Sequence, residues 1–90
     1  MSYVAEEVNV ARFKCLLAND DEMQLQALTH IMKASDFKVI PVKNGYEAFL
    51  EAQKSIKNNE LFDLILLDLN MPITDGYEAC MQIIGLYNQI

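Results

Sequence analysis

Three aspartates are the side chains best suited to chemistry in this sequence of 90 residues. Asp20 and Asp21 follow the short apolar run 13–18, and Asp68 stands near the end of the most apolar stretch of the chain, 61–69. Carboxylate oxygens are ligands that Mg²⁺ prefers, and an aspartate can also act as a nucleophile. If the three side chains meet in space, a bound metal would shield an incoming phosphoryl group, and Asp68 could attack its phosphorus to form an acyl phosphate.

The segments around these aspartates alternate between strand and helix patterns. The runs 13–18, 37–42 and 61–69 are predicted as strands, and 64–67 has no polar alternation, which is typical of a parallel strand covered on both faces. Each run is followed by apolar residues at helical spacing, which predicts three amphipathic helices. Their expected apolar faces are Leu25, Leu28, Ile31 and Met32 in the first helix, Ala48, Phe49, Ala52 and Ile56 in the second, and Tyr77, Cys80, Met81 and Ile84 in the third.

This order predicts an α/β fold, β-α-β-α-β-α, with a parallel sheet and right-handed crossovers. Pro41 falls within the second strand, and because proline has no N–H for a sheet ladder, this strand is expected at an edge. The predicted strand order is therefore 2-1-3, with the first helix on one face and the other two on the opposite face. A crevice then opens between the carboxyl ends of strands one and three, where open α/β sheets bind ligands.

The aspartates are expected at that crevice. Aspartates after strands are often only helix N-caps or turn formers, and this structural role stays open for Asp20, Asp21 and Asp68 alike. Several like charges at one apex are costly, however, unless a cation lies among them. Three carboxylates at one crevice therefore favour a shared Mg²⁺ site.

Composition limits the class of protein. Seven Lys and Arg side chains oppose thirteen Asp and Glu, and the net charge of −6 argues against nucleic-acid binding through phosphate neutralisation. The apolar runs are too short to cross a bilayer and no cleavable signal is apparent, so we expect a soluble, cytoplasmic protein. Cys15 and Cys80 lack disulfide-scaffold or zinc-site spacing, and both are expected to be reduced thiols in the core.

Three segments resemble the receiver domain of two-component response regulators. They are 16–22 (Leu-Leu-Ala-Asn-Asp-Asp-Glu), 44–48 (Asn-Gly-Tyr-Glu-Ala), and 63–78, which contains Asp68, Asn70, Met71-Pro72 and Asp75-Gly76. All three occur in the order and spacing of that family. The resemblance implies a flavodoxin-like receiver fold over residues 13–90, preceded by an amino-terminal extension at 1–12.

The resemblance also implies roles for individual residues. Asp68 would be the phosphoacceptor and a metal ligand, Asp21 a direct Mg²⁺ ligand, and Asp20 a ligand acting mainly through metal-bound water. Asn70 would lend its main-chain carbonyl to the metal. The phosphoryl donor in this family is a phosphohistidine on a histidine kinase or a histidine phosphotransfer protein. Any catalysis would then be limited to Mg²⁺-dependent self-phosphorylation and autodephosphorylation at Asp68.

The sequence also departs from the family pattern. Receiver domains continue for two further strands and helices, and carry a Ser or Thr after strand four and a Lys after strand five that bind the phosphoryl oxygens. The sequence stops at Ile90, before either position, and neither Thr74 nor Lys43 matches them. The alternative function is thus a truncated, switch-deficient receiver that acts only as a protein-interaction or dimerisation module. The unpaired third strand and the uncovered face of the first helix predict self-association.

Two other functions fit the pattern less well. His30, with Lys33 three residues later, faintly resembles the active helix of histidine phosphotransfer proteins, which needs a helical bundle rather than an α/β fold. A phosphatase of the haloacid dehalogenase type would need a second Asp two residues after its nucleophile, where Asn70 stands. The aromatic and Met side chains are expected to pack in the core, among them Met32, Phe49, Phe62, Tyr77 and Met81.

Overall fold

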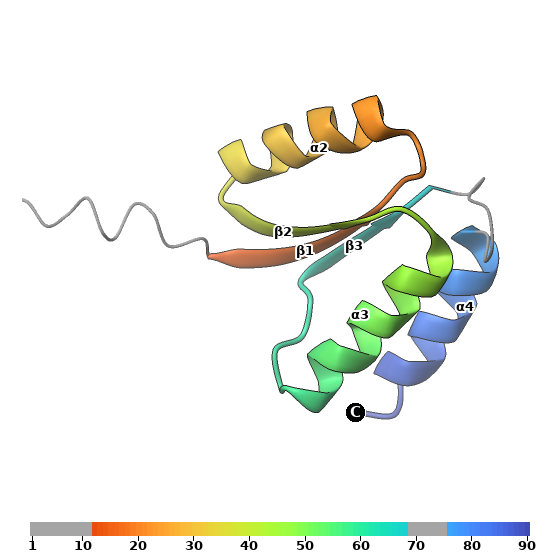
Figure 1. The fold of residues 1–90 in the computed structure, drawn as a ribbon. Helices are drawn as coiled ribbons and strands as arrows, with labels where there is room; N and C mark the ends of the chain where they lie inside the picture. Colours follow the sequence, from red (N-terminus) through yellow and green to blue (C-terminus); the bar gives the residue numbers. More distant parts are fainter. Residues whose placement is uncertain (1–11, 69–75) are drawn as a thin grey trace, which may run out of the picture.

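The computed structural model describes residues 12–68 and 76–90, which form a parallel sheet covered by helices on both faces (Figure 1). Its elements are β1 (Phe13–Ala18), α2 (Glu22–Ala34), β2 (Phe37–Val42), α3 (Gly45–Lys57), β3 (Leu64–Leu67) and α4 (Gly76–Tyr87). Among these residues the strand order is β2-β1-β3, and both pairings are parallel. The predicted α/β class and the predicted order 2-1-3 are confirmed.

The central strand is the most deeply buried part of the chain. Cys15 and Leu16 are fully inaccessible to solvent, and Leu17 and Ala18 are nearly so. The edge position of β2 is also confirmed, since Pro41 pairs with Leu17 of β1 on one side and is exposed. Proline suits an edge strand because its missing N–H costs no ladder hydrogen bond there.

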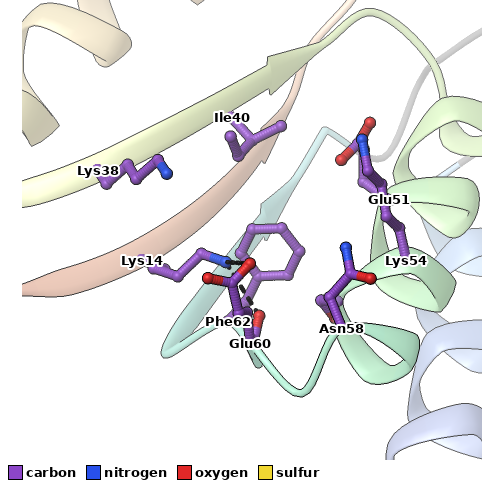
Figure 2. Close-up of a pocket in the computed structure, with 9 residues that line it drawn as sticks. Lys14, Lys38, Ile40, Glu51, Lys54, Asn58, Glu60 and Phe62 are labelled. Carbon is purple, nitrogen blue, oxygen red and sulfur yellow. Dashed lines mark hydrogen bonds and ion pairs between the residues drawn. The ribbon is translucent and has the colours of Figure 1, made fainter.

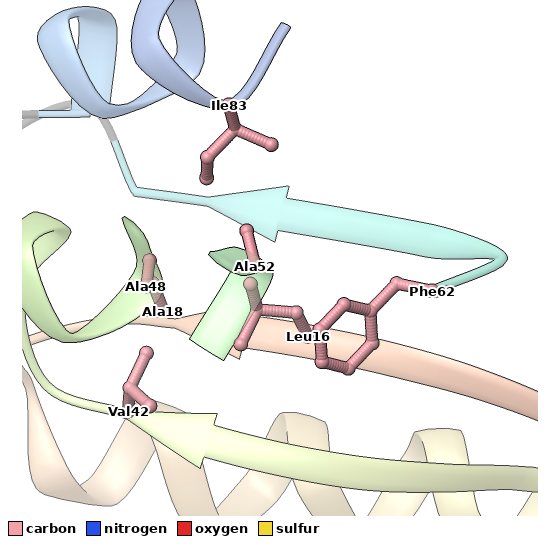
Figure 3. Close-up of a cluster of buried hydrophobic side chains, with 7 residues drawn as sticks. All are labelled: Leu16, Ala18, Val42, Ala48, Ala52, Phe62 and Ile83. Atoms are coloured by element: carbon pink, nitrogen blue, oxygen red, sulfur yellow. The ribbon is translucent and has the colours of Figure 1, made fainter. Parts of the chain in front are cut away.

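Alternate side chains of the strands build two core layers, because successive residues of a strand point to opposite faces. On one face α2 packs Leu25 onto Cys15, Leu17 and Val39. On the other face α3 and α4 cover a second cluster, which Figure 3 shows: Leu16, Ala18, Val42, Ala48, Ala52, Phe62 and Ile83. The predicted division of the helices, one against two, is therefore confirmed (Figure 1).

Two side chains fix the points where α2 and α3 begin. Asp21 is the N-cap of α2, and Asn44 is the N-cap of α3, where its Oδ1 accepts a hydrogen bond from the N–H of Glu47 at 2.8 Å. The Glu47 carboxylate in turn accepts from the N–H of Lys43 at 3.1 Å. Each N-cap contributes about 1 kcal/mol to stability, and both lie at the carboxyl end of the sheet.

The prediction of which side of α4 is buried is wrong. Tyr77, Cys80, Met81 and Ile84 share one side of the helix, but that side is exposed, to 67% for Tyr77 and 71% for Met81. The helix instead buries Ala79 and Ile83, and packs Leu86 and Tyr87 against the core. Because α4 is apolar on most of its surface, helical periodicity alone does not identify the buried side.

Two further expectations need correction. Cys15 is buried, as predicted, and burial raises the pKa of its thiol, whereas Cys80 is exposed on α4. Met32, Phe49 and Phe62 pack in or against the core as expected, but Tyr77 and Met81 do not.

The third strand is shorter and less covered than its sequence predicts. It spans Leu64–Leu67 only, and Leu66 is 36% exposed. Among the residues that the structure describes, β3 pairs with β1 alone, and α2 packs mainly over β1 and β2, with Leu64 the residue of β3 in the same apolar cluster. A continuous apolar run therefore does not mean coverage of both faces in this part of the chain.

Candidate functional site

The carboxyl ends of β1 and β3 bring the two acidic segments to the same edge of the sheet. Ala18 and Leu67 are partners in the parallel pairing, and the N–H of Asp68 donates to the carbonyl oxygen of Ala18 at 2.9 Å. Asp68 is half-buried, whereas Asp20 and Asp21 are exposed in the loop after β1. The sequence prediction that these segments become neighbours is thus correct for the backbone.

Asp21 has a structural role that the sequence left open. Its Oδ1 accepts hydrogen bonds from the N–H groups of Met23, at 3.0 Å, and Gln24, at 3.2 Å. This places a negative charge at the positive end of the α2 dipole, which stabilises the helix. Both bonds use Oδ1, so Oδ2 of the same carboxylate takes part in neither.

Asn19 is a site residue that the sequence analysis missed. It is 6% exposed, its Oδ1 accepts from the N–H of Asp21 at 2.8 Å, and its Nδ2 donates to Oε1 of Gln24 at 3.0 Å. Its own N–H donates to the carbonyl oxygen of Val42 at 3.1 Å. Asn19 therefore holds the loop that carries Asp20 and Asp21. An Asn two residues before a helix N-cap is a known turn signal, which could have identified it.

A cavity of about 260 Å³ opens between α2 and the end of β3. Its polar lining comes from Asn19, Gln24 and Asp68, and its apolar lining includes Leu28 and Leu66. Asp20 and Asp21 do not line it. The crevice expected between the ends of strands one and three is present, and among the described residues that line it Asp68 is the one carboxylate.

The three carboxylates are nevertheless not gathered into a metal centre. Within residues 12–68 and 76–90, no group of three or more Asp, Glu, His or Cys side chains is arranged to hold a metal ion. The N-cap bonds of Asp21 turn one of its oxygens toward α2. Asn70 and Thr74 lie outside the described residues, so the expected carbonyl ligand has no described position.

An ion pair stands beside the acidic loop. The Lys43 ammonium lies 2.9 Å from Oε1 of Glu22 and joins the end of β2 to the first turn of α2. The hydrogen bond from Lys43, with a smaller one from Gln26, lowers the pKa of Glu22, and the same Glu22 bond raises the pKa of Lys43. Lys43 is therefore engaged with Glu22 at this edge of the sheet.

The remaining sequence candidates do not build a second centre here. His30 is exposed on α2, within an α/β fold rather than a helical bundle. In the described segments, no helix has both the length and the apolar character needed to cross a membrane.

The comparisons with known proteins agree on one family. Residues 15–90 match the family model described as response regulator receiver domain. The chain is 39% identical over 69 residues to transcriptional regulatory protein ResD of Bacillus subtilis, covering 76% of this chain and 27% of that protein. It is 34% identical over 68 residues to hybrid signal transduction histidine kinase E of Dictyostelium discoideum, covering 76% of this chain and 4% of that protein.

Solved structures show the same fold. A chain of the CheX-CheY-BeF3-Mg²⁺ complex from Borrelia burgdorferi superposes with a TM-score of 0.74 at 26% identity, over 84% of this chain and 55% of that one. The Mg²⁺-bound receiver domain of the histidine kinase CKI1 from Arabidopsis thaliana gives a TM-score of 0.76 at 23% identity, over 90% of this chain and 62% of that one. The chain thus spans less than two thirds of each of these relatives.

Proposed function

The chain belongs to the response regulator receiver domain family of two-component systems, and on that premise we propose that Asp68 accepts a phosphoryl group from a phosphohistidine with Mg²⁺ bound beside it. The observation that carries the proposal is the bond from the N–H of Asp68 to Ala18, which sets Asp68 next to the acidic loop. Asp68 also lines the cavity at this edge of the sheet. An aspartate in such a place can receive a ligand from outside the fold.

The donor set at this edge suits Mg²⁺ because all of its ligands would be oxygens. Asp21 would bind through Oδ2, since the N-cap bonds use Oδ1. Asp68 would contribute a carboxylate oxygen, Asp20 would act through water, and Asn70 would offer its main-chain carbonyl. When bound, the metal supplies charge neutralisation for the phosphoryl oxygens.

The chain's own residues perform the transfer. A carboxylate oxygen of Asp68 attacks phosphorus, a P–O bond forms as the P–N bond to the donor histidine breaks, and the imidazole leaves with the electron pair. Asn19 holds the acidic loop through its bond to the N–H of Asp21. The Ala18–Asp68 bond keeps the nucleophile at the end of β3.

The partner is inferred to be a histidine kinase or a histidine phosphotransfer protein. One similar protein is, by its name, a hybrid signal transduction histidine kinase. The solved relatives include complexes named with Mg²⁺ and BeF3. These names support a phosphorelay role and a metal at the site.

A chemical phosphodonor tests the proposal directly. The chain is incubated with Mg²⁺ and acetyl phosphate, and intact mass spectrometry is used to follow a phosphoryl adduct. The adduct is expected with Mg²⁺, is lost on addition of EDTA, and is absent from Asp68→Asn. The matched control is Asp36→Asn, since Asp36 has a φ of 73° at the opposite end of the sheet and Asn tolerates that conformation.

An adduct that persists in Asp68→Asn would refute Asp68 as the acceptor. The absence of any adduct, with no Mg²⁺-dependent spectral change, would leave the chain with an interaction role alone.

A further inference from the structure

A second pocket lies at the end of the sheet opposite Asp68. Lys14 and Lys38 occupy the second positions of β1 and β2, whereas Asp68 follows the last residue of β3. The pocket has a volume of about 160 Å³ and sits between β2, α3 and the loop that leads into β3 (Figure 2). Its lining includes Lys38, Ile40, Glu51, Lys54, Asn58 and Phe62.

One of the lysines that line the pocket is already engaged. The Nζ of Lys14 donates to the carbonyl oxygen of Glu60 at 3.0 Å and lies 4.0 Å from the Glu60 carboxylate. It also stands 5.2 Å from the centre of the Phe62 ring. Lys14 and Glu60 therefore neutralise each other and hold the Phe62 ring in place.

The other charged side chains that line the pocket carry a net positive charge. None of the ion pairs found among the described residues includes Lys38 or Lys54. Among the described residues that line the pocket, Glu51 is the one carboxylate besides Glu60. The lining thus holds two ammonium groups outside these ion pairs and one such carboxylate, in a chain whose net charge is −6. This surplus favours a ligand with a single negative charge.

The floor of the pocket is apolar. Phe62 is only 9% exposed, and Ile40 is half-buried beside it. In Figure 2 the Lys38 side chain lies along β2 toward Ile40, and Asn58 lies beside Phe62 at the end of α3. Asn58 is the C-cap of α3, so its backbone is fixed and its amide can donate to an acceptor.

We propose that this pocket binds a small organic anion, whose carboxylate contacts Lys38 and Lys54 and whose short apolar body packs on Phe62 and Ile40. The site uses neither Asp68 nor a metal, and so is separate from the phosphoacceptor function. Ligands of this size reach dissociation constants of about a millimolar.

The test uses butyrate and its uncharged analogue butyramide. Titrations of the chain are followed by NMR shifts of the Ile40 methyl groups and the Phe62 ring, with Asp68→Asn and EDTA present so that phosphoacceptor chemistry is absent. Butyrate is expected to saturate these shifts and butyramide to bind at least about threefold more weakly. Lys38→Met and Lys54→Met should each weaken butyrate about two- to fivefold, since each removes one exposed charge contact.

Two further variants separate the charges of the pocket from those outside it. Glu51→Gln removes the competing carboxylate and should tighten butyrate about two- to fivefold. Lys57→Met, on the same helix but outside the lining, should leave binding unchanged. Equal binding of butyramide, equal loss in Lys57→Met and Lys54→Met, or weakening in Glu51→Gln would each overturn the proposal. Backbone amide spectra confirm that every variant is folded.

Discussion

The main-chain N–H of Asp68 donates to the carbonyl oxygen of Ala18 at 2.9 Å, one step beyond the last residue pair of the β1–β3 ladder. This bond extends the pairing of two segments that are far apart in sequence. It fixes the position of the Asp68 backbone at the end of β3. The carboxylates of Asp20, Asp21 and Asp68 are nevertheless not arranged as a metal site, and Oδ1 of Asp21 accepts hydrogen bonds from the first turn of α2. The proposed metal site therefore depends on side chains that also serve the fold.

That double role of Asp21 can be separated by two substitutions. Asp21→Ala removes both the cap and the proposed ligand, and should lower the free energy of unfolding by about 1 kcal/mol. Asp21→Asn keeps a capping oxygen and should change stability by only a few tenths of a kcal/mol, yet abolish Mg²⁺-dependent phosphorylation. Urea unfolding in EDTA and adduct formation by mass spectrometry measure the two effects. Equal phosphorylation in wild type and Asp21→Asn would contradict the ligand role.

Asn19 should matter for both stability and rate. Asn19→Ala leaves the N–H of Asp21 without its side-chain acceptor, so we expect a loss of about 1 kcal/mol and slower adduct formation. The control is Gln24→Ala, which removes only the partner of Nδ2 and keeps the bond to Asp21. Chemical denaturation and the initial rate with acetyl phosphate provide the measurements. A larger effect of Gln24→Ala than of Asn19→Ala would show that the loop is held elsewhere.

The Lys43–Glu22 pair predicts a specific pH dependence of stability. Because Lys43 lowers the pKa of Glu22 below its ordinary value of 4.5, this contribution is present above that value and is lost as pH falls through the lowered pKa. Lys43 has a raised pKa, so its contribution is present below 10.5 and is lost as pH rises through the raised value.

Urea midpoints of wild type and Lys43→Met should therefore differ most between these two limits and converge at acidic and alkaline pH. The difference is small because both side chains are more than half exposed, and added salt should reduce it further. Lys33→Met is the control, since Lys33 is in none of the ion pairs found in the described residues. A constant difference across pH would mean that Lys43 acts through packing.

The two cysteines should react at very different rates. Cys80 is exposed, whereas Cys15 is fully buried and burial raises the pKa of its thiol, which lowers the reactive thiolate fraction. We expect alkylation by iodoacetamide to modify Cys80 at least about tenfold faster than Cys15 in the native chain. Peptide mapping distinguishes the two sites, and Cys80→Ser should remove the fast phase. Comparable rates in urea would show that the difference comes from the fold.

The sequence was sufficient for the topology because its strongest signals are local. Pro41 identified the edge strand, and the apolar runs identified the order of elements. Face assignment failed where a helix is apolar on most sides, as for Met81 in α4. The direction of the Asp21 carboxylate could not be predicted from the sequence either. The same oxygens can accept from the N–H groups of α2 or bind a ligand, and which they do depends on the folded geometry. The same holds for Asn19, which is buried and whose side chain bonds to both Asp21 and Gln24.

The exposed side of β3 predicts self-association of the chain. Leu66 is 36% exposed on a strand that pairs only with β1 among the described residues, and such an edge can pair with another chain. Ile31, 56% exposed on α2, marks the other candidate surface. Light scattering at micromolar concentration should detect species larger than the monomer.

Leu66→Lys should shift this equilibrium toward the monomer, because a charged side chain at a strand edge opposes pairing. Leu50→Lys is the matched control, since Leu50 is 42% exposed on α3, away from both surfaces. If Ile31→Lys restores the monomer and Leu66→Lys does not, the α2 face is the contact and the β3 edge is not. A monomer in the unmodified chain at all concentrations would refute association through either surface, and the exposed apolar side chains would then be tolerated in water.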